Sequence, residues 1–265
     1  MESVKIIILA IIQGITEWLP ISSTAHLIIA RDLIRVNLSD NFWYLFSVVV
    51  QLGSVLAVII LYFNRLNPFV KDKIERDSKW ILWFKIVVAT IPAAILGYFL
   101  DDAVASVLSE NYVIAITLIV YGLLFLYFDK NKSFKINDTK DITYKTAALV
   151  GLFQALAIIP GTSRSGATIL GCIILGFNRK TASEFSFFMA LPVMFGASLL
   201  RVLKSDLAFS NQEMYFLALG TVVSLVVSLL VIKELIKFVK SHSFKVFAYY
   251  RIALALVLLF YIFFN

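Results

Sequence analysis

Two pairs of polar residues flank a proline near the start of the chain, inside an otherwise apolar segment. Gln13 and Glu17 are four residues apart before Pro20, and Ser23 and His26 are three apart after it. At these spacings the members of each pair share one face of a helix. A carboxylate can hold a divalent cation against phosphate oxygens, a histidine can carry a proton near neutral pH, and a serine can act as a nucleophile. The combination indicates phosphoryl-transfer chemistry.

A second polar stretch, "PGTSRSGAT" at 160–168, also interrupts an apolar run, and it carries an arginine. Pro160 should end one helix, and Thr162 or Ser163 should cap the next one, which places Arg164 in its first turn. A helix start offers unpaired backbone N–H groups and a partial positive charge, and both favour an anion. We predict that the partner of Arg164 is phosphate.

The hydroxyl groups of both stretches are candidate ligands of that phosphate. The candidate substrate-binding residues are Ser22, Thr24, Ser163, Arg164, Ser165 and Thr168. The candidate catalytic residues are Glu17, Ser23, His26 and Arg164, with Glu17 also a candidate metal ligand. Helix capping and hydrogen bonds between helices are the alternative role of each hydroxyl. Pairing with a neighbouring helix is the alternative role of the glutamate and the histidine.

The composition of the whole chain determines where these stretches must lie. Of its 265 residues, 60% are apolar, 14% are aromatic and only 15% are charged. A chain this apolar cannot cover itself with a water-compatible surface, so we interpret it as an integral membrane protein. An arginine near the bilayer centre costs about 2.5 to 3.5 kcal/mol even on the mild insertion scale, so Arg164 needs a partner. The single cysteine, Cys172, excludes an internal disulfide framework and a multi-cysteine metal cage.

Six apolar stretches are long enough to cross a bilayer as helices, which takes about 20 residues. They are 42–63, 80–100, 111–128, 185–203, 214–236 and 245–264. Two further apolar regions, 4–35 and 145–177, are split by the polar stretches, and each half is too short to cross. Two short helices joined by a polar turn predict a re-entrant hairpin, whose turn is tolerated at membrane depth only inside protein or a wet cavity. The predicted fold class is an all-α polytopic membrane protein with six transmembrane helices and two re-entrant helix-turn-helix hairpins.

The two hairpins also resemble each other. Aligning Gln13 with Gln154 brings Ser23 onto Ser163 when one residue is skipped, which is a repeat of about 140 residues. Each hairpin is followed by three predicted crossings, and this shared layout supports the repeat more than the letters do. A hairpin returns to the side it left and three is an odd number. The second half must therefore enter the membrane from the opposite face, which gives inverted-topology repeats.

Basic residues orient this arrangement. Sixteen of the 24 Lys and Arg residues lie in the segments 64–79, 129–145, 178–184 and 233–245. By the positive-inside rule these segments face the cytoplasm, so both termini and the first hairpin belong outside. The net charge of +7 is then a topology signal and not a nucleic-acid patch. The predicted boundaries are 1–265 for a single membrane domain, about 1–128 and 142–265 for the pseudo-repeats and 129–141 for the cytoplasmic linker.

These motifs resemble those of the bacterial undecaprenyl-pyrophosphate phosphatases, the bacitracin-resistance family. The resemblance rests on Gln13-x-x-x-Glu17 followed by P-x-S-S-x-x-H, on "PGTSRSGAT", and on "ASEFSFFMALP" after it. It implies a multi-pass enzyme of the bacterial plasma membrane. Such an enzyme removes the terminal phosphate of undecaprenyl pyrophosphate and recycles the lipid carrier of cell-wall synthesis.

The resemblance also implies a divalent cation, Mg or Ca, and a set of site residues. The family's acidic motif falls on Gln13 and Glu17, its serine and histidine on Ser23 and His26, and its phosphate-binding arginine on Arg164. Gln13 stands where many relatives carry a second glutamate, so metal binding should be weaker here or should use Glu17 alone. The attacking group is either Ser23 or a water activated by His26. The implied partners are a polyprenyl pyrophosphate lipid and the bilayer, with a homodimer as an open alternative to a monomer. The active site should open to the extracytoplasmic side.

Three other classes of protein fit part of this pattern. Inverted repeats with broken helices are also transporter architecture, so the site could move undecaprenyl phosphate across the membrane, with or without hydrolysis. A membrane phosphatase with a histidine nucleophile needs a second histidine, but the other one, His242, lies far from these motifs. A purely structural membrane protein gives no reason for Arg164.

Overall fold

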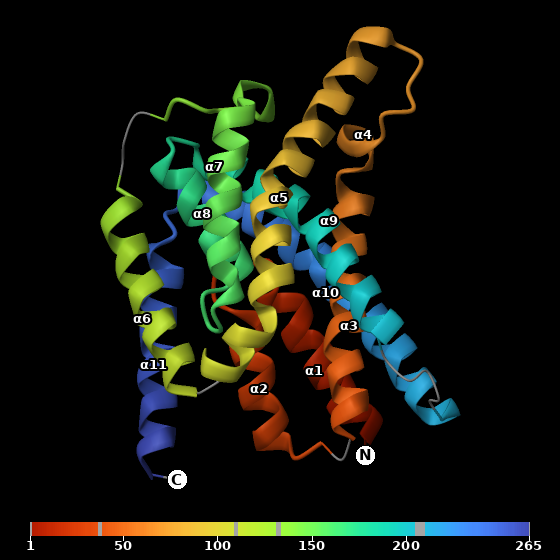
Figure 1. Cartoon of the computed structure of the whole chain (residues 1–265), viewed down its shortest axis with the longest axis vertical. Helices are drawn as coiled ribbons and strands as arrows, with labels where there is room; N and C mark the ends of the chain where they lie inside the picture. Colours follow the sequence, from red (N-terminus) through yellow and green to blue (C-terminus); the bar gives the residue numbers. More distant parts are fainter. Residues whose placement is uncertain (1, 37–38, 109–110, 131–133, 205–209, 265) are drawn as a thin grey trace.

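The computed structural model describes residues 2–36, 39–108, 111–130, 134–204 and 210–264, which form a bundle of helices (Figure 1). Within these ranges the regular structure is helical, apart from one isolated bridge between Ile136 and Phe177. The predicted all-α fold class is confirmed.

Six of the described helices are long and apolar enough to cross a membrane. They are α3 (Asp40–Leu61), α5 (Lys73–Leu108), α6 (Asn111–Phe128), α9 (Arg179–Lys204), α10 (Asn211–Ser241) and α11 (Lys245–Phe264). Each coincides with one predicted crossing. α10 begins before the predicted 214–236 because Ser210 and Glu213 form a capping box, with Ser210 N donating to Glu213 Oε2 at 2.8 Å. The short helices α4 (Phe63–Leu66) and η1 (Thr139–Asp141) lie in the connections.

Two pairs of shorter helices complete the bundle. The first pair is α1 (Glu2–Thr16) and α2 (Ser23–Ile34). The second is α7 (Tyr144–Ala155), extended by the 3-10 turn η2 (Leu156–Ile158), and α8 (Arg164–Ile174). α1 and α2 occupy the lower half of Figure 1 and α7 and α8 the upper half, so the two breaks meet in the middle of the molecule. Broken helices are therefore present in both regions where the sequence predicts them.

Both breaks end in a serine that caps the next helix. Ser22 Oγ accepts a hydrogen bond from Ala25 N at 3.4 Å, and Ser163 Oγ accepts one from Gly166 N at 3.1 Å. These serines also share an uncommon backbone conformation, with φ of 73° and 71°. The shared cap geometry aligns Ser22 with Ser163, whereas the sequence alignment pairs Ser23 with Ser163. The alignment skipped a residue to match two prolines, whereas the backbone needs no skip.

Each helix pair packs against crossings of the other half of the chain. α1 packs on α10, and α7 packs on α5. The contact of α7 with α5 is very close, because a Cβ added at Gly151 would collide with the carbonyl of Ala89. Gly53 allows an equally close approach between α3 and α10, where an added Cβ would collide with the Thr221 carbonyl. Small residues at such positions let helix backbones pack tightly in a membrane.

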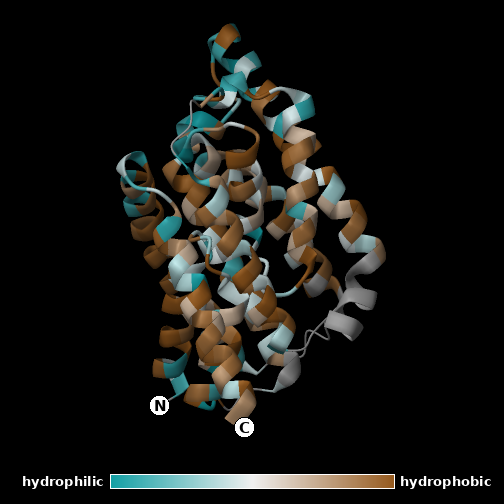
Figure 2. Cartoon of the chain, turned by 90° about the vertical axis from the view of Figure 1, so that its left-hand side faces the viewer, coloured by the Kyte–Doolittle hydropathy of each residue, from teal (hydrophilic) through white to brown (hydrophobic). Residues whose placement is uncertain are grey.

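Hydrophilic residues gather most densely at the end of the molecule opposite the two termini, as Figure 2 shows. Two ion pairs connect segments at this end. Arg65 Nη1 lies 2.6 Å from Glu184 Oε2, and Arg179 Nε lies 2.8 Å from Asp129 Oδ1. Arg65 lies in α4, Asp129 follows α6, and both of their partners lie in α9, so the start of α9 is tied to two of the connections.

Candidate active site

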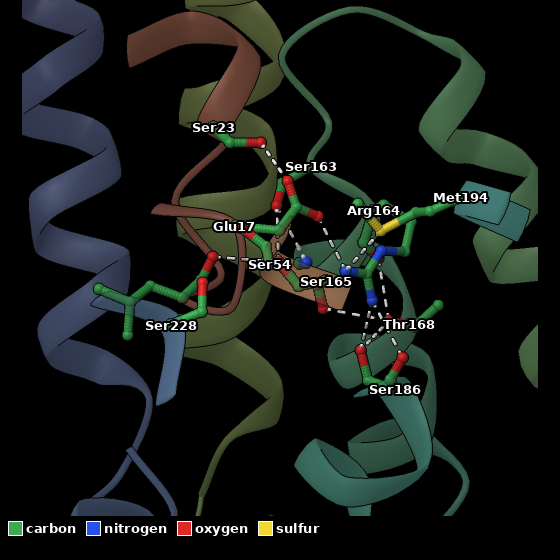
Figure 3. Close-up of polar contacts among 12 residues, drawn as sticks. Glu17, Ser23, Ser54, Ser163, Arg164, Ser165, Thr168, Ser186, Met194 and Ser228 are labelled. Carbon is green, nitrogen blue, oxygen red and sulfur yellow. Dashed lines mark hydrogen bonds and ion pairs between the residues drawn. The ribbon is translucent and has the colours of Figure 1, made fainter. Parts of the chain in front are cut away.

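The carboxylate of Glu17 lies at the break after α1 and is the centre of a buried polar network (Figure 3). Its side chain is only 6% exposed. Oε2 accepts hydrogen bonds from Gln13 Nε2 and Ser23 Oγ, both at 2.9 Å. Oε1 accepts one from Arg164 Nη2, also at 2.9 Å. The structure therefore brings together four of the residues that the sequence singles out: two from before the first break, one from after it and one from the second break.

Arg164 is the first residue of α8 and reaches across to the first helix pair. Its Nη1 donates to Ser186 O at 2.9 Å, and its guanidinium lies 5.5 Å from the ring centroid of Trp18. Nε is buried and has no partner among the described residues. The sequence predicts phosphate as the partner of Arg164, and within the chain this cation pairs with Glu17. A buried cation needs a nearby counter-charge, and Glu17 supplies it within the chain.

The hydroxyls of the second break hold the two breaks together. Ser165 Oγ donates to Leu19 O at 3.0 Å and lies 3.2 Å from Ser163 Oγ. Thr168 Oγ1 donates to Arg164 O at 2.9 Å and lies 2.6 Å from Ser186 Oγ. Thr168 thus bonds both to the first turn of α8 and to Ser186, the residue whose carbonyl accepts from Arg164.

His26 is directed to a different neighbour. Its Nδ1 lies 2.7 Å from Ser22 O, and its Nε2 lies 2.7 Å from the hydroxyl of Tyr250, on which the imidazole ring stacks. A carbonyl oxygen only accepts, so Nδ1 carries the hydrogen and Nε2 accepts the Tyr250 hydrogen bond. Among the described contacts none joins His26 to Glu17 or Ser23, although Ser23 and His26 are three residues apart.

Arg251 of α11 is a buried residue of the site that sequence reasoning missed. It is 0% exposed, and it donates to Pro20 O at 3.0 Å in the first break and to Gly161 O at 3.1 Å and Thr162 O at 3.0 Å in the second. One guanidinium therefore ties both breaks. The signal was available: an arginine inside a predicted crossing needs a partner for the same reason as Arg164.

A cavity of about 310 Å³ opens between the two breaks. The first helix pair contributes Glu17, Ser22, Ser23 and Thr24 to its wall, and the second contributes Gln154, Pro160, Gly161, Ser163, Arg164 and Ser165. Gln51 of α3 and small or apolar residues of α5 and α9, among them Ala93, Gly97 and Ala197, also line the wall. The charged residues of the lining are Glu17 and Arg164, and both α2 and α8 begin at the cavity. Their N-termini favour an anion.

The described residues contain no group of three or more His, Cys, Asp and Glu side chains placed to hold a metal ion. Among the oxygen atoms that could hold a cation are the carboxylate of Glu17, which lines the cavity, and Oε1 of the adjoining Gln13, which is buried and has no partner in the described structure. Mg²⁺ is usually held by one or two carboxylates together with substrate phosphates. This donor set fits a cation that binds together with the substrate.

The fold and the site define the class: a multi-pass helical membrane protein with a buried Glu–Arg cavity where two broken helix pairs meet. The model of one family, described as "Bacitracin resistance protein BacA", matches residues 6–257, and the chain belongs to that family. The chain is 48% identical to the "Undecaprenyl-diphosphatase" of Acetivibrio thermocellus, over 98% of both chains. It is 47% identical to the "Undecaprenyl-diphosphatase 1" of Clostridioides difficile, over 99% of this chain and 97% of that one. It is also 48% identical to the "Undecaprenyl-diphosphatase" of Enterococcus faecalis strain V583, over 97% of this chain and 96% of that one.

Proposed function

We propose that the protein is an undecaprenyl-pyrophosphate phosphatase, which hydrolyses a polyprenyl pyrophosphate to the monophosphate and phosphate. The observation that carries this proposal is the full-length similarity to relatives named for that activity, with 48% identity over 98% of the chain in one case. The cavity is consistent with it, because an arginine, two helix N-termini and several hydroxyls meet there. The family role of such an enzyme is to recycle the lipid carrier of cell-wall synthesis.

In the proposed reaction the Arg164 guanidinium binds oxygens of the terminal phosphate, together with the N-termini of α2 and α8. An attacking oxygen forms a bond to the terminal phosphorus, and the bond from that phosphorus to the bridging oxygen breaks. The bridging oxygen leaves with the electron pair as part of the polyprenyl monophosphate. The Ser23 hydroxyl is one candidate attacker, since it donates to Glu17 Oε2 at 2.9 Å and Glu17 can take its proton. The oxygen of a water then bonds to that phosphorus as the bond to Ser23 Oγ breaks, and Ser23 takes back the proton from Glu17. In the alternative route the water attacks the terminal phosphorus directly.

The charge of the cavity supports a requirement for a divalent cation. Glu17 and Arg164, the charged residues of the lining, cancel each other, whereas a pyrophosphate ester brings more than one negative charge. Mg or Ca would be held by Glu17 and by Oε1 of Gln13, together with phosphate oxygens, and would neutralise charge on the transferred group. The residues of the chain still orient the phosphate and move the proton.

We further propose that the two helix pairs are re-entrant hairpins in inverted-topology repeats of one membrane domain. The exchange of contacts supports this, since α1 packs on α10 of the second half while α7 packs on α5 of the first. Both ends of the chain lie opposite the hydrophilic end in Figure 2, and the basic residues of the connections make the positive-inside rule favour termini outside the cytoplasm and an extracytoplasmic opening for the site. To check the orientation, a cysteine is added at the C-terminus of the protein and intact cells are treated with a membrane-impermeant thiol reagent. Labelling in intact cells supports the orientation. Labelling only when the reagent reaches the cytoplasmic side contradicts it.

Phosphate release in detergent tests the function and separates it from transport. Purified protein with undecaprenyl pyrophosphate should release phosphate with Mg²⁺ and should stop when a chelator is added. Detergent leaves no two sides to transport between, so a pure transporter releases nothing. Release that continues in full with chelator contradicts the metal role but not the hydrolysis.

A further inference from the structure

Gln154 lies at the end of α7, on the wall of the cavity, and its side-chain amide is buried without a hydrogen-bond partner. The residue is 2% exposed, yet neither Nε2 nor Oε1 has a hydrogen-bond partner among the described residues. A buried amide without a partner loses its hydrogen bonds to water and gains none in return. A ligand bound in the adjoining cavity would supply the missing hydrogen-bond partner of this amide.

Comparison with the first helix pair explains why the chain itself offers no partner. The same offset of 141 residues separates Gln13 from Gln154 and the cap Ser22 from the cap Ser163. Gln13 Nε2 donates to Glu17 Oε2 at 2.9 Å, but the offset places Ile158 where the first pair has this carboxylate. The second pair therefore keeps the amide and lacks its acceptor.

The cavity that Gln154 lines also contains Arg164 and the start of α8, which favour an anion. We propose that Gln154 is a substrate-binding residue, whose Nε2–H donates to a phosphate oxygen of the pyrophosphate. Its Oε1 accepts from water or from a protonated oxygen of the same ligand. The amide adds a donor without adding charge, so it binds phosphate without needing a counter-ion of its own. This proposal rests on the proposed function.

Gln154→Leu tests the proposal, because leucine has a similar volume and no polar atoms. We expect KM for undecaprenyl pyrophosphate to rise about tenfold or more, as the loss of one hydrogen bond to a charged group predicts. The melting temperature of the ligand-free protein should stay the same or rise, since no internal hydrogen bond is lost. In wild type, inorganic pyrophosphate with Mg²⁺ should raise the melting temperature, and the leucine variant should lose most of that shift.

The matched control is Ser54→Ala, at a buried hydroxyl of α3 that is not among the residues lining the cavity. Ser54 Oγ lies 2.6 Å from Ser224 Oγ, so the alanine leaves Ser224 without a partner. Its melting temperature should fall while KM stays near the wild-type value, which is the opposite pattern to Gln154→Leu.

A wild-type KM in Gln154→Leu overturns the proposal, whatever its melting temperature. If this variant loses both stability and affinity, Gln154→Glu decides. The glutamate replaces the donor with an acceptor and adds negative charge, so a phosphate ligand should bind it more weakly than the leucine variant. An equal KM in the two variants overturns the role in binding. A wild type that releases no phosphate refutes the proposed function separately, because the pyrophosphate shift still reports on Gln154.

Discussion

The substitution Arg164→Lys isolates what the guanidinium contributes beyond its positive charge. Two different nitrogens of Arg164 donate to Glu17 Oε1 and to Ser186 O, each at 2.9 Å, so the side chain is held from two directions. Lysine has one nitrogen and cannot present a planar pair of donors to phosphate oxygens. Both side chains should hold the ground-state substrate to some degree. Only the planar pair of guanidinium donors stabilises the negative charge that develops on the transferred phosphoryl group in the transition state.

The expected magnitude follows from the loss of one such donor. Removing a single hydrogen-bond donor to a developing charge lowers kcat by roughly 100-fold or more, which corresponds to about 3 kcal/mol. We therefore expect Arg164→Lys to lower kcat about 100-fold and to raise KM by less. The assay is steady-state phosphate release from undecaprenyl pyrophosphate in detergent, with the melting temperature measured on the same sample.

Arg179→Lys is the matched control, at a pair of similar burial outside the cavity. Arg179 lies 2.8 Å from Asp129, and the side chains of Arg179 and Arg164 are each 13% exposed. The control should lose stability to a similar extent and keep kcat within about twofold, because a static pair contributes to folding and not to the transition state. A kcat near the wild-type value in Arg164→Lys would refute the reasoning, as would an equal loss of kcat in the control.

Three further outcomes are expected. Gln13→Glu should lower the divalent-cation concentration for half-maximal phosphate release, because it adds a carboxylate beside Glu17, and an unchanged requirement would exclude Gln13 as a ligand. Ser23→Ala should lower kcat more than His26→Ala, since Ser23 contacts Glu17 and His26 contacts Tyr250. The reverse order in kinetic assays would favour a water activated by the histidine. Arg251→Met should lower stability by about 3 kcal/mol or more in thermal unfolding, because buried carbonyls of both breaks lose their donor. An unchanged melting temperature would show that those carbonyls find other partners.

The local features of the fold were predictable from the sequence because they depend on neighbours along the chain. Length and hydropathy indicated the six crossings, and the prolines with the following serines indicated the two breaks. Two adjacent serines follow the first proline, and the hydrogen bond from Ala25 N to Ser22 Oγ identifies Ser22 as the cap. The geometry of a cap depends on backbone dihedral angles, and the sequence does not show which of two adjacent serines adopts them.

The partners of the site residues were not predictable in the same way, because they depend on tertiary packing. Glu17 and Arg164 are 147 residues apart and meet only when the two breaks come together. Tyr250, which binds His26, lies in a run that the sequence identifies only as a crossing. Arg251 was hidden in the same run, since its apolar neighbours keep the segment above the threshold for a span. The orphaned amide of Gln154 is also a tertiary property, which no spacing rule reports.

The position of Arg251 in the chain determines when the contacts between the two breaks can form during synthesis. Arg251 follows Pro20 by 231 residues and Gly161 by 90, yet it donates to backbone carbonyls of the breaks formed around both. During synthesis both breaks leave the ribosome well before the residue that ties them, and domains fold as their segments emerge. Until α11 inserts, those carbonyls lack their donor, so the tie between the two breaks forms only after both breaks have been made. A chain that stops before α11 would carry every residue that lines the cavity and still lack the tie between its two halves.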